Sequence, residues 1–440
     1  MYQGSAKSYP ITHKKKEQNT IYPNNMNTTK RLFPILSFLL FFGSLAFGQS
    51  IIKEASNAVI AGVDKERLHR YDKFLQKEIE EERIPGAVSY IIRKGEVIHK
   101  AAYGYSSMTD SSPIKQDQLF HIMSMTKPIV TAAFMMLYEE GYFSLTDPVS
   151  KYLPQFKNIR VAKNVEQGVK GETVPANKEI TINHLLTHTA GFSHGLGGTT
   201  LDNDYVKALY SEPHKNIESS VNAMLKLPLV GQPGEQWYYS ASPDVLSLLI
   251  EHFSGLTTSE FLKTRLFEPL EMEDTGYNIS QDNRYRWMPV HSIDKNGKLI
   301  NSPNQLPIEG NTIYGGTHGL FSTASDYMKF CQMLLNKGEY NGKHLLSPKT
   351  IEIMTMNQVS DLYQAPGQGF GLGFGITTNL ADSKSLGSVG QYYWSGAYCT
   401  YFFIDPKEEL VVILMSQLQP YNNYYGEKMR QMVYQSLVQE

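Results

Sequence analysis

The chain has 440 residues, with 41 Lys and Arg against 43 Asp and Glu, so its net charge of −2 is close to zero. Apolar residues make up 41% and charged residues 19%, which is typical of an ordinary globular protein and excludes an intrinsically disordered one. There is no basic excess of the kind that nucleic-acid binding requires, so nucleic acid is not an expected partner.

The first 48 residues have the pattern of a secretory signal peptide. Lys30 and Arg31 precede an apolar run, and Ala46-Phe-Gly48 closes that run with small residues, so cleavage is expected before Gln49. The run is short for a membrane span, so no stable membrane anchor is expected after cleavage. A start at Met26 would give a signal of ordinary length and stays open. The expected location is the bacterial periplasm or the medium.

The next segments predict a helix and a β-hairpin. Apolar residues recur with helical spacing between Glu66 and Arg83. Two strand-like runs, 87–93 and 96–101, flank Lys94-Gly95, a turn sequence typical of a hairpin.

Ser124 and Lys127 stand three residues apart where a helix begins, so their side chains share one helical face. A serine hydroxyl needs a base to become a nucleophile, and a desolvated lysine can be that base. The run that follows, Pro128 to Gly141, is apolar on nearly every face and ends in a glycine suited to a helix end. A buried helix gives the serine rigid support, so we interpret Ser124 as a nucleophile rather than as a cap beside a surface lysine.

Three other motifs in the chain are weaker. Gly191 to Gly195 fits G-x-S-x-G around Ser193, but a helix precedes it where that motif needs a strand. His184 and His188 have a metal-ligand spacing but no third ligand nearby, so no metal is expected. Gly369 to Gly375 resembles a nucleotide fingerprint without the βαβ context, so no organic cofactor is expected either.

The chain closes with a second hairpin and a helix. Thr400–Asp405 and 410–415 read as strands, and Tyr425 to Val438 as a helix. Cys331 falls in a helical pattern and reads as a core residue, and a disulfide between Cys331 and Cys399 stays open. Strands at both ends and helices between them predict an α/β (α+β) fold: one antiparallel sheet flanked by N- and C-terminal helices, from 49–155 and 291–440, with an inserted, mostly helical part at 156–290.

Several sequence blocks in a fixed order resemble the superfamily of serine β-lactamases, penicillin-binding proteins and related esterases, over about residues 66 to 438. They are the Ser124-x-x-Lys127 motif, Ile84-Pro-Gly-Ala87, Gly141-Tyr-Phe-Ser-Leu-Thr-Asp-Pro148, His184-Leu-Leu-Thr-His-Thr-Ala-Gly191, Pro233-Gly-Glu-Gln-Trp-Tyr-Tyr239-Ser240, Pro269-Leu-Glu-Met-Glu-Asp-Thr-Gly276 and Gly315-Gly-Thr-His-Gly-Leu-Phe-Ser-Thr323. The chain looks most like the class C β-lactamase branch, and especially the carboxylesterases on that fold.

The resemblance implies that Tyr239 shares proton transfer with Lys127 near the nucleophile. Lactam-cleaving members usually have Asn two residues after this tyrosine, where this chain has Ala241. Asp244 matches esterase-like relatives, but Ser242-Pro-Asp244 also reads as a helix cap, a proline in the first turn and a first-turn acid. We favour the capping interpretation.

The family's Lys-Thr-Gly block corresponds here to Trp394-Ser395-Gly396-Ala397, so the cation that would pair with a substrate carboxylate is replaced by an aromatic wall. The backbone N–H groups of Ser124 and Ala397 match the family's oxyanion hole. Trp394, Ser395, Gly396 and, in the glycine-rich block, His318 are the expected substrate-binding residues.

The sequence therefore predicts an exported serine hydrolase, with Ser124 as nucleophile and Lys127 and Tyr239 as acid and base. The expected substrate is a small molecule, a neutral ester in the first place, with an amide or a cell-wall-derived substrate as the alternative. A β-lactamase or D-amino-acid peptidase is the rival enzyme, and a catalytically silent cell-wall-binding protein is the rival of another class.

Overall fold

The structure is a computed structural model that describes residues 53–54 and 61–438, all of which fall in one unit, Gly48–Glu440. The predicted signal peptide lies outside the described residues, so it stays a prediction. Among the described residues, no helix combines the length and the apolar character that crossing a bilayer requires.

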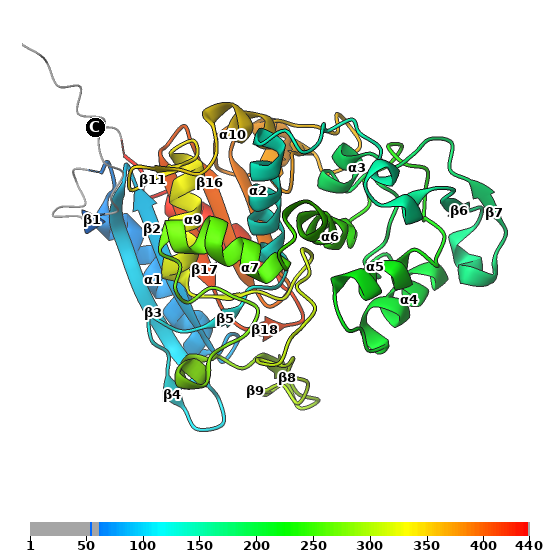
Figure 1. The fold of residues 1–440 in the computed structure, drawn as a ribbon. Coiled ribbons are helices and arrows are strands. Elements are labelled where there is room, and N and C mark those ends of the chain that lie inside the picture. Colours follow the sequence, from blue (N-terminus) through cyan, green and yellow to red (C-terminus); the bar gives the residue numbers. More distant parts are fainter. Residues whose placement is uncertain (1–52, 55–60, 439–440) are drawn as a thin grey trace, which may run out of the picture. The chain divides into compact units, whose positions relative to one another are not determined.

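A nine-stranded sheet organises the described chain (Figure 1), in the order β1-β3-β2-β17-β16-β15-β14-β13, with β4 paired to β3. Every pairing in it is antiparallel except that of β1 with β3. Its strands are β1 Lys53–Glu54, β2 Gly86–Arg93, β3 Glu96–Ser107, β4 Ser112–Pro113, β13 Gln368–Phe370, β14 Gly375–Thr377, β15 Tyr392–Gly396, β16 Thr400–Asp405 and β17 Leu410–Met415.

Both predicted hairpins are confirmed and lie side by side in this sheet, since β2 pairs with β17. The strands alternate side chains between two buried clusters. Val88, Ile92 and Ile413 face one cluster, and Ala87, Ile91 and Val412 face the other. Successive side chains of a strand point to opposite faces, and since β2, β16 and β17 are buried at every position, both faces of the sheet are covered there.

Helices cover the two faces. Those of the described residues are α1 Lys65–Glu80, α2 Thr126–Glu139, α3 Ile182–Leu186, α4 Thr200–Val206, α5 Ile217–Met224, α6 Ser242–Ser254, α7 Thr258–Leu262, α8 Glu268–Leu270, α9 Ala324–Leu335, α10 Pro348–Met354, α11 Leu380–Ser383 and α12 Asn423–Tyr434. Helices α1 and α12 pack on each other and on one face, and α9 packs against β2 and β17 on the other (Figure 1). The prediction of a sheet flanked by the N- and C-terminal helices is confirmed.

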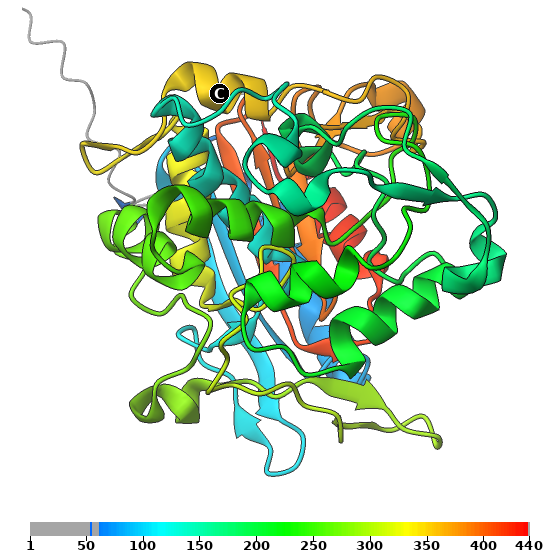
Figure 2. The same cartoon turned by 45° about the vertical axis from the view of Figure 1, so that its right-hand side comes forward.

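Short strand pairs complete the described structure. They are β5 Phe120–His121 with β10 Phe321–Ser322, β6 Arg160–Ala162 with β7 Thr173–Pro175, β8 His291–Ile293 with β9 Leu299–Asn301 and β18 Leu418–Gln419, and β11 Glu339–Tyr340 with β12 Lys343–His344. Helices α3 to α7, green in Figure 2, belong to the segment predicted to be mostly helical, which also contains the β6–β7 pair. The boundaries of that segment at 156 and 290 stay predictions.

Helix α2 is buried along almost its whole length, as the apolar run predicted, with residues 126–137 all buried. It packs against α6 and α7. Glu140 caps it, and Gly141 follows with φ of +80°. The nucleophile candidate therefore stands at the start of a helix that cannot shift without disturbing the core.

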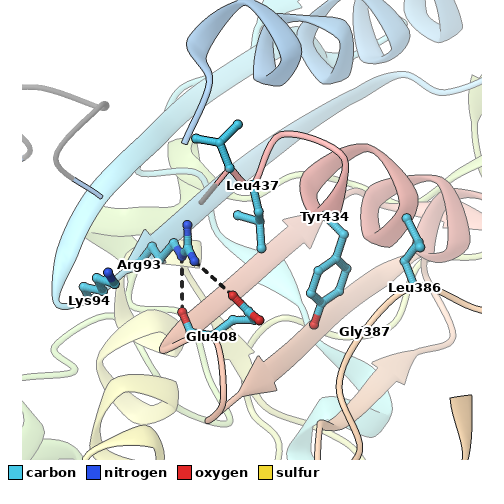
Figure 3. A pocket seen from close by; sticks show the side chains of 8 residues that line it. Arg93, Lys94, Leu386, Gly387, Glu408, Tyr434 and Leu437 are labelled. Atoms are coloured by element: carbon cyan, nitrogen blue, oxygen red, sulfur yellow. Dashed lines mark hydrogen bonds and ion pairs between the residues drawn. The ribbon is translucent and has the colours of Figure 1, made fainter. Parts of the chain in front are cut away.

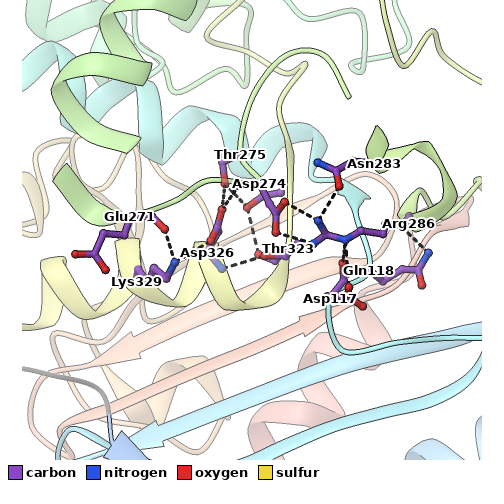
Figure 4. Close-up of polar contacts among 11 residues, drawn as sticks. Asp117, Gln118, Glu271, Asp274, Thr275, Asn283, Arg286, Thr323, Asp326 and Lys329 are labelled. Atoms are coloured by element: carbon purple, nitrogen blue, oxygen red, sulfur yellow. Dashed lines mark hydrogen bonds and ion pairs between the residues drawn. The ribbon is translucent and has the colours of Figure 1, made fainter. Parts of the chain in front are cut away.

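A polar network fastens the segment 271–287 to α9 and to the chain before β5 (Figure 4). Arg286 donates to both carboxylate oxygens of Asp274, at 2.7 and 2.6 Å, and lies 3.3 Å from Asp117. Asp326, in the first turn of α9, accepts the N–H of Asp274 at 2.8 Å and also pairs with Lys329. These charge-assisted bonds hold the loop after α8 in place.

Candidate active site

Ser124 lies in a single 3₁₀ turn, η1 Met123–Met125, that leads directly into α2. The residue before it, Met123, has φ of +46°, a left-handed conformation that non-glycine residues rarely adopt. Strain of this kind costs about 1–3 kcal/mol and is concentrated at functional sites. Strand β15 closes on the same turn, because Gly396 is so near the carbonyl of Ile122 that a Cβ atom would lie 2.3 Å from its oxygen.

Lys127 contacts the serine directly, with Nζ 3.1 Å from Ser124 Oγ. It also donates to the carbonyl oxygen of Thr317 at 2.8 Å, and only 1% of the residue is exposed. Burial lowers the pKa of this amine from 10.5 to about 7, although the carboxylate of Asp244 raises it in part. A substantial fraction of Lys127 is therefore neutral near pH 7 and able to accept a proton.

Tyr239 stands over this pair, with Lys127 Nζ 4.5 Å from the centre of its ring. Burial raises the pKa of Tyr239, and hydrogen bonding to Ser124 lowers it in part, so the phenol is protonated at neutral pH. The structure thus brings together Ser124, Lys127 and Tyr239 from three segments far apart in the sequence. Their catalytic roles remain predictions that this proximity supports.

Asp244 lies in the first turn of α6 as expected, but the expected cap at Ser242 is wrong. Helix α6 does begin at Ser242 with Pro243 in its first turn, but Ala241 holds the cap position and no side chain caps the helix. The Asp244 carboxylate instead accepts the N–H of Thr317 at 2.8 Å, and the carbonyl of that residue receives the Lys127 ammonium. Gly315 permits this approach, since a Cβ there would lie 2.8 Å from the carboxylate. The sequence around Asp244 indicated only a helix cap. It could not indicate the bond to Thr317, because the two residues are more than seventy positions apart.

Strand β15 supplies an aromatic wall. The ring of Trp394 lies 5.5 Å from that of Tyr239 and 5.3 Å from that of Phe370. Ser395 Oγ lies 3.1 Å from the hydroxyl of Tyr421. Ala397 follows the strand directly and is exposed, one residue after the Gly396 contact with the Ser124 turn. The oxyanion role of the Ser124 and Ala397 N–H groups stays a prediction.

A polar group of side chains also adjoins Tyr239. His194, whose ring lies 5.6 Å from that of Tyr239, stacks at 6.3 Å on His318, and both are partly exposed. His318 was an expected binding residue, whereas His194 and Tyr210 beside it were not. The signal for His194 lay in the G-x-S-x-G motif, where only the serine was weighed.

The residues of the three weaker motifs have structural roles in the fold. Ser193 is fully buried and donates to the Asp202 carboxylate, so its hydroxyl holds a loop. His184 Nδ1 accepts the N–H of Thr181 in a helix cap, and His188 Nδ1 accepts that of Ser240 at 3.3 Å. Within the described residues, no cluster of three or more His, Cys, Asp or Glu side chains could hold a metal ion. Gly369 to Gly375 spans the β13–β14 connection.

A separate cavity of about 490 Å³ lies where the β2–β17 pairing ends at Arg93 and Leu410 (Figure 3). Its lining includes Arg93, Glu408 and Tyr434. The Arg93 guanidinium donates hydrogen bonds to Glu408 and to the carbonyls of Ala61 and Gly62. None of the proposed catalytic side chains lines it.

Known proteins are similar to this chain in sequence and in fold. The family model described as Beta-lactamase matches residues 71–434. Protein Rv1367c of Mycobacterium tuberculosis is 31% identical over 353 residues, covering 77% of this chain and 86% of its own. Esterase EstB of Burkholderia gladioli is 25% identical, covering 79% and 89%. The solved structure of EstCE1, a hydrolase with promiscuous acyltransferase activity, has a TM-score of 0.71 at 23% identity, covering 84% and 99%, and shows likeness of fold.

Proposed function

Because the chain belongs to the beta-lactamase family, whose fold carries serine hydrolases, we propose that it is a carboxylesterase that cleaves small neutral esters through an acyl-enzyme on Ser124. The observation that carries the proposal is the contact of Lys127 Nζ with Ser124 Oγ beneath Tyr239. The relative named as an esterase supports the substrate class.

The proposed reaction has two stages. Neutral Lys127 takes the proton of Ser124 as Oγ attacks the ester carbonyl, and the backbone N–H groups of Ser124 and Ala397 stabilise the oxyanion. The proton passes by way of Lys127 and Tyr239 to the departing alkoxide, which leaves as an alcohol. Water then attacks the acyl-enzyme, gives up a proton to the same pair and releases the acid, and Ser124 recovers its hydrogen.

Trp394 supports neutral rather than anionic substrates. An indole cannot form the charge-assisted hydrogen bond that a lysine would give to a substrate carboxylate, and that bond is worth about 1.5–3 kcal/mol. The rings of Trp394, Tyr239 and Phe370 instead offer an apolar surface. We expect p-nitrophenyl acetate and butyrate to be turned over much better than nitrocefin or a D-Ala-D-Ala peptide.

The deciding measurement is kcat/KM on that panel for the natural chain and for Trp394→Lys. The new cation should shift the ratio toward the anionic substrates by about 10- to 150-fold, the equivalent of the lost bond. Trp394→Phe, which keeps an aromatic ring, should leave the preference for esters. A cephalosporin cleaved as fast as the esters by the natural chain would favour the β-lactamase alternative.

A fluorophosphonate probe separates an active enzyme from a silent binding protein. It should label the natural chain and Ser193→Ala, but not Ser124→Ala. Labelling that followed Ser193 would remove Ser124 from the mechanism.

We also propose export, which rests on the basic and apolar pattern of residues 1–48 alone. N-terminal sequencing of protein from the producing cell should find Gln49 as the first residue. Retention of the segment in cytoplasmic protein would refute export.

A further inference from the structure

Three segments bring a hydrogen-bonding group of side chains close to Tyr239. The hydroxyl of Tyr210 lies 2.5 Å from His194 Nδ1, and the ring of Tyr210 is 5.6 Å from that of His318. His194 and His318 lie nearly parallel, at 12°. The proton-transfer path of Ser124, Lys127 and Tyr239 uses none of these three side chains, which we call the imidazole–phenol cluster.

The backbone on each side of His194 is fixed. Ser193 donates to Asp202, a carboxylate with no exposed surface, and accepts the N–H of Gly195 at 2.8 Å. The hydroxyl of Tyr238 donates to the same carboxylate, at 2.9 Å. Because the buried Asp202 carboxylate accepts several hydrogen bonds, the loop is rigid, and this fixes the position of His194.

Tyr210 and His318 are also held in place. Tyr210 belongs to a single π-helical turn, η5 Lys207–Ser211, in which Leu209 is buried while 43% of Tyr210 is exposed. Such turns are uncommon and often occur at functional sites. His318 follows Thr317, whose N–H and carbonyl are bound by Asp244 and Lys127. The cluster is therefore pre-organised, which lowers the cost of binding.

The charge state of the cluster favours neutral ligands. Burial lowers the pKa of His194 and of His318, the carboxylate of Asp244 raises that of His318 in part, and the charge of Lys127 lowers both. A neutral imidazole offers one donor and one acceptor. The ring nitrogens of His318 form no hydrogen bond with any other residue that the structure describes, so they are available to a ligand. The hydrogen bond between the Tyr210 hydroxyl and His194 Nδ1 leaves Nε2 of His194 for a ligand, as a donor in the tautomer whose Nδ1 accepts from Tyr210.

We propose that Tyr210, His194 and His318 form a binding subsite for a neutral hydroxyl- or amide-bearing part of the ester substrate, next to Tyr239, whose ring the apolar wall of Trp394 also adjoins. The subsite deepens the proposed esterase function and rests on it. The substrate would then be a polar-substituted ester, with one end against the indole and the other hydrogen-bonded to the imidazoles. The hydroxyl could belong to the acyl group or to the alcohol.

Two matched pairs of esters test the subsite. p-Nitrophenyl β-hydroxybutyrate is compared with p-nitrophenyl butyrate for the acyl end, and glycerol monoacetate with propyl acetate for the alcohol end. The natural chain should prefer the hydroxylated member of at least one pair. His318→Phe and His194→Phe keep a ring but lose the nitrogens, so each should reduce that preference about 5-fold, the worth of one neutral hydrogen bond.

Since the plain ester is an internal reference in every variant, a partly misfolded preparation does not change the ratio. Tyr210→Phe, which removes one oxygen, is the milder second variant and should lower the ratio in the same direction. Tyr285→Phe, on an exposed tyrosine elsewhere, should keep the ratio of the natural chain.

The outcomes are distinct. A preference at either end that falls in the cluster variants supports the subsite and identifies the end it binds. No preference in the natural chain, or a preference that survives both histidine changes, overturns it. Failure of the natural chain to hydrolyse any plain ester would instead overturn the proposed function.

Discussion

Lys127 is almost completely buried, unlike an ordinary surface lysine. Since its pKa is about 7, kcat/KM for p-nitrophenyl acetate should rise with pH and level off above about 8, as the amine loses its proton. Lys127→Ala should lower the acylation rate about 10²–10⁴-fold and remove this rise. Stopped-flow measurement of the p-nitrophenol burst from pH 5 to 9 tests both. A burst of normal size and rate in Lys127→Ala would exclude the residue as the base.

The charge of Asp244 raises the pKa of Lys127, and its hydrogen bond to Thr317 holds the carbonyl that Lys127 contacts. Two substitutions separate these effects. Asp244→Asn keeps an oxygen that can accept the Thr317 N–H but removes the charge, so the pKa of Lys127 should fall and the rise in rate should move to lower pH. Asp244→Ala also loses the bond and should destabilise the fold by about 1–3 kcal/mol. pH–rate profiles and urea unfolding give the two readouts. An unmoved profile in Asp244→Asn would show that its charge does not reach Lys127.

Among the contacts of the site, the sequence predicted those between residues that are close together along the chain. Ser124 and Lys127 meet because they are three residues apart on one helical start, and spacing alone indicates that. Tyr239 was placed by resemblance. The bond from Thr317 to Asp244 and the pairing of His194 with Tyr210 needed the folded chain, because no periodicity connects residues so far apart.

One carboxylate, Asp72, links helix α1 to strand β3 by hydrogen bonds. It accepts from Tyr103 at 2.5 Å and lies 2.8 Å from His99 Nε2 and 3.0 Å from His69 Nδ1. Burial alone would raise its pKa, but the hydrogen bonds from His99, Tyr103 and His69 outweigh burial and lower the pKa to about 2. A carboxyl group with a depressed pKa stabilises the fold above its unfolded pKa, near 4, and loses that contribution as the pH falls toward 2.

Asp72→Asn should therefore lower the free energy of unfolding by about 2 kcal/mol at pH 7, from the pKa difference. The gap between the variant and the natural chain should close between pH 4 and pH 2. Urea unfolding at a series of pH values measures it. Glu66→Gln, on an exposed residue in the first turn of the same helix, is the control for a change of charge alone. A gap that stayed constant with pH would mean that the carboxylate charge is not what stabilises the docking.

Elements were predicted best where strand alternation and a turn coincide. Strands β16 and β17 begin and end at the predicted residues, and β3 extends beyond its predicted end at Ala101 to Ser107. The last helix ends at Tyr434 rather than Val438. The register between β2 and β17 joins segments more than three hundred residues apart, so only the resemblance could have indicated it.

At the scale of the whole molecule, the sheet separates the two large hydrophobic clusters of the described residues, and each of these contains one cysteine. Cys331, on α9, is fully buried in the larger cluster, as its helical pattern predicted. Cys399, after β15, is 1% exposed in the cluster that includes α1 and α12. Both are free thiols, which answers the question of a disulfide that the sequence left open.

Burial raises the pKa of both thiols, so neither should react with an alkylating reagent while the protein is folded. Iodoacetamide should leave the native protein unmodified at pH 8 and add two groups once urea has unfolded it, without any reductant. Intact-protein mass spectrometry counts the groups, and dithiothreitol should leave the midpoint of thermal unfolding unchanged. Because the two thiols lie in different clusters, equal labelling rates in partial denaturant would show that both clusters unfold together. Two groups added only after reduction would instead show that the cysteines pair in the exported protein.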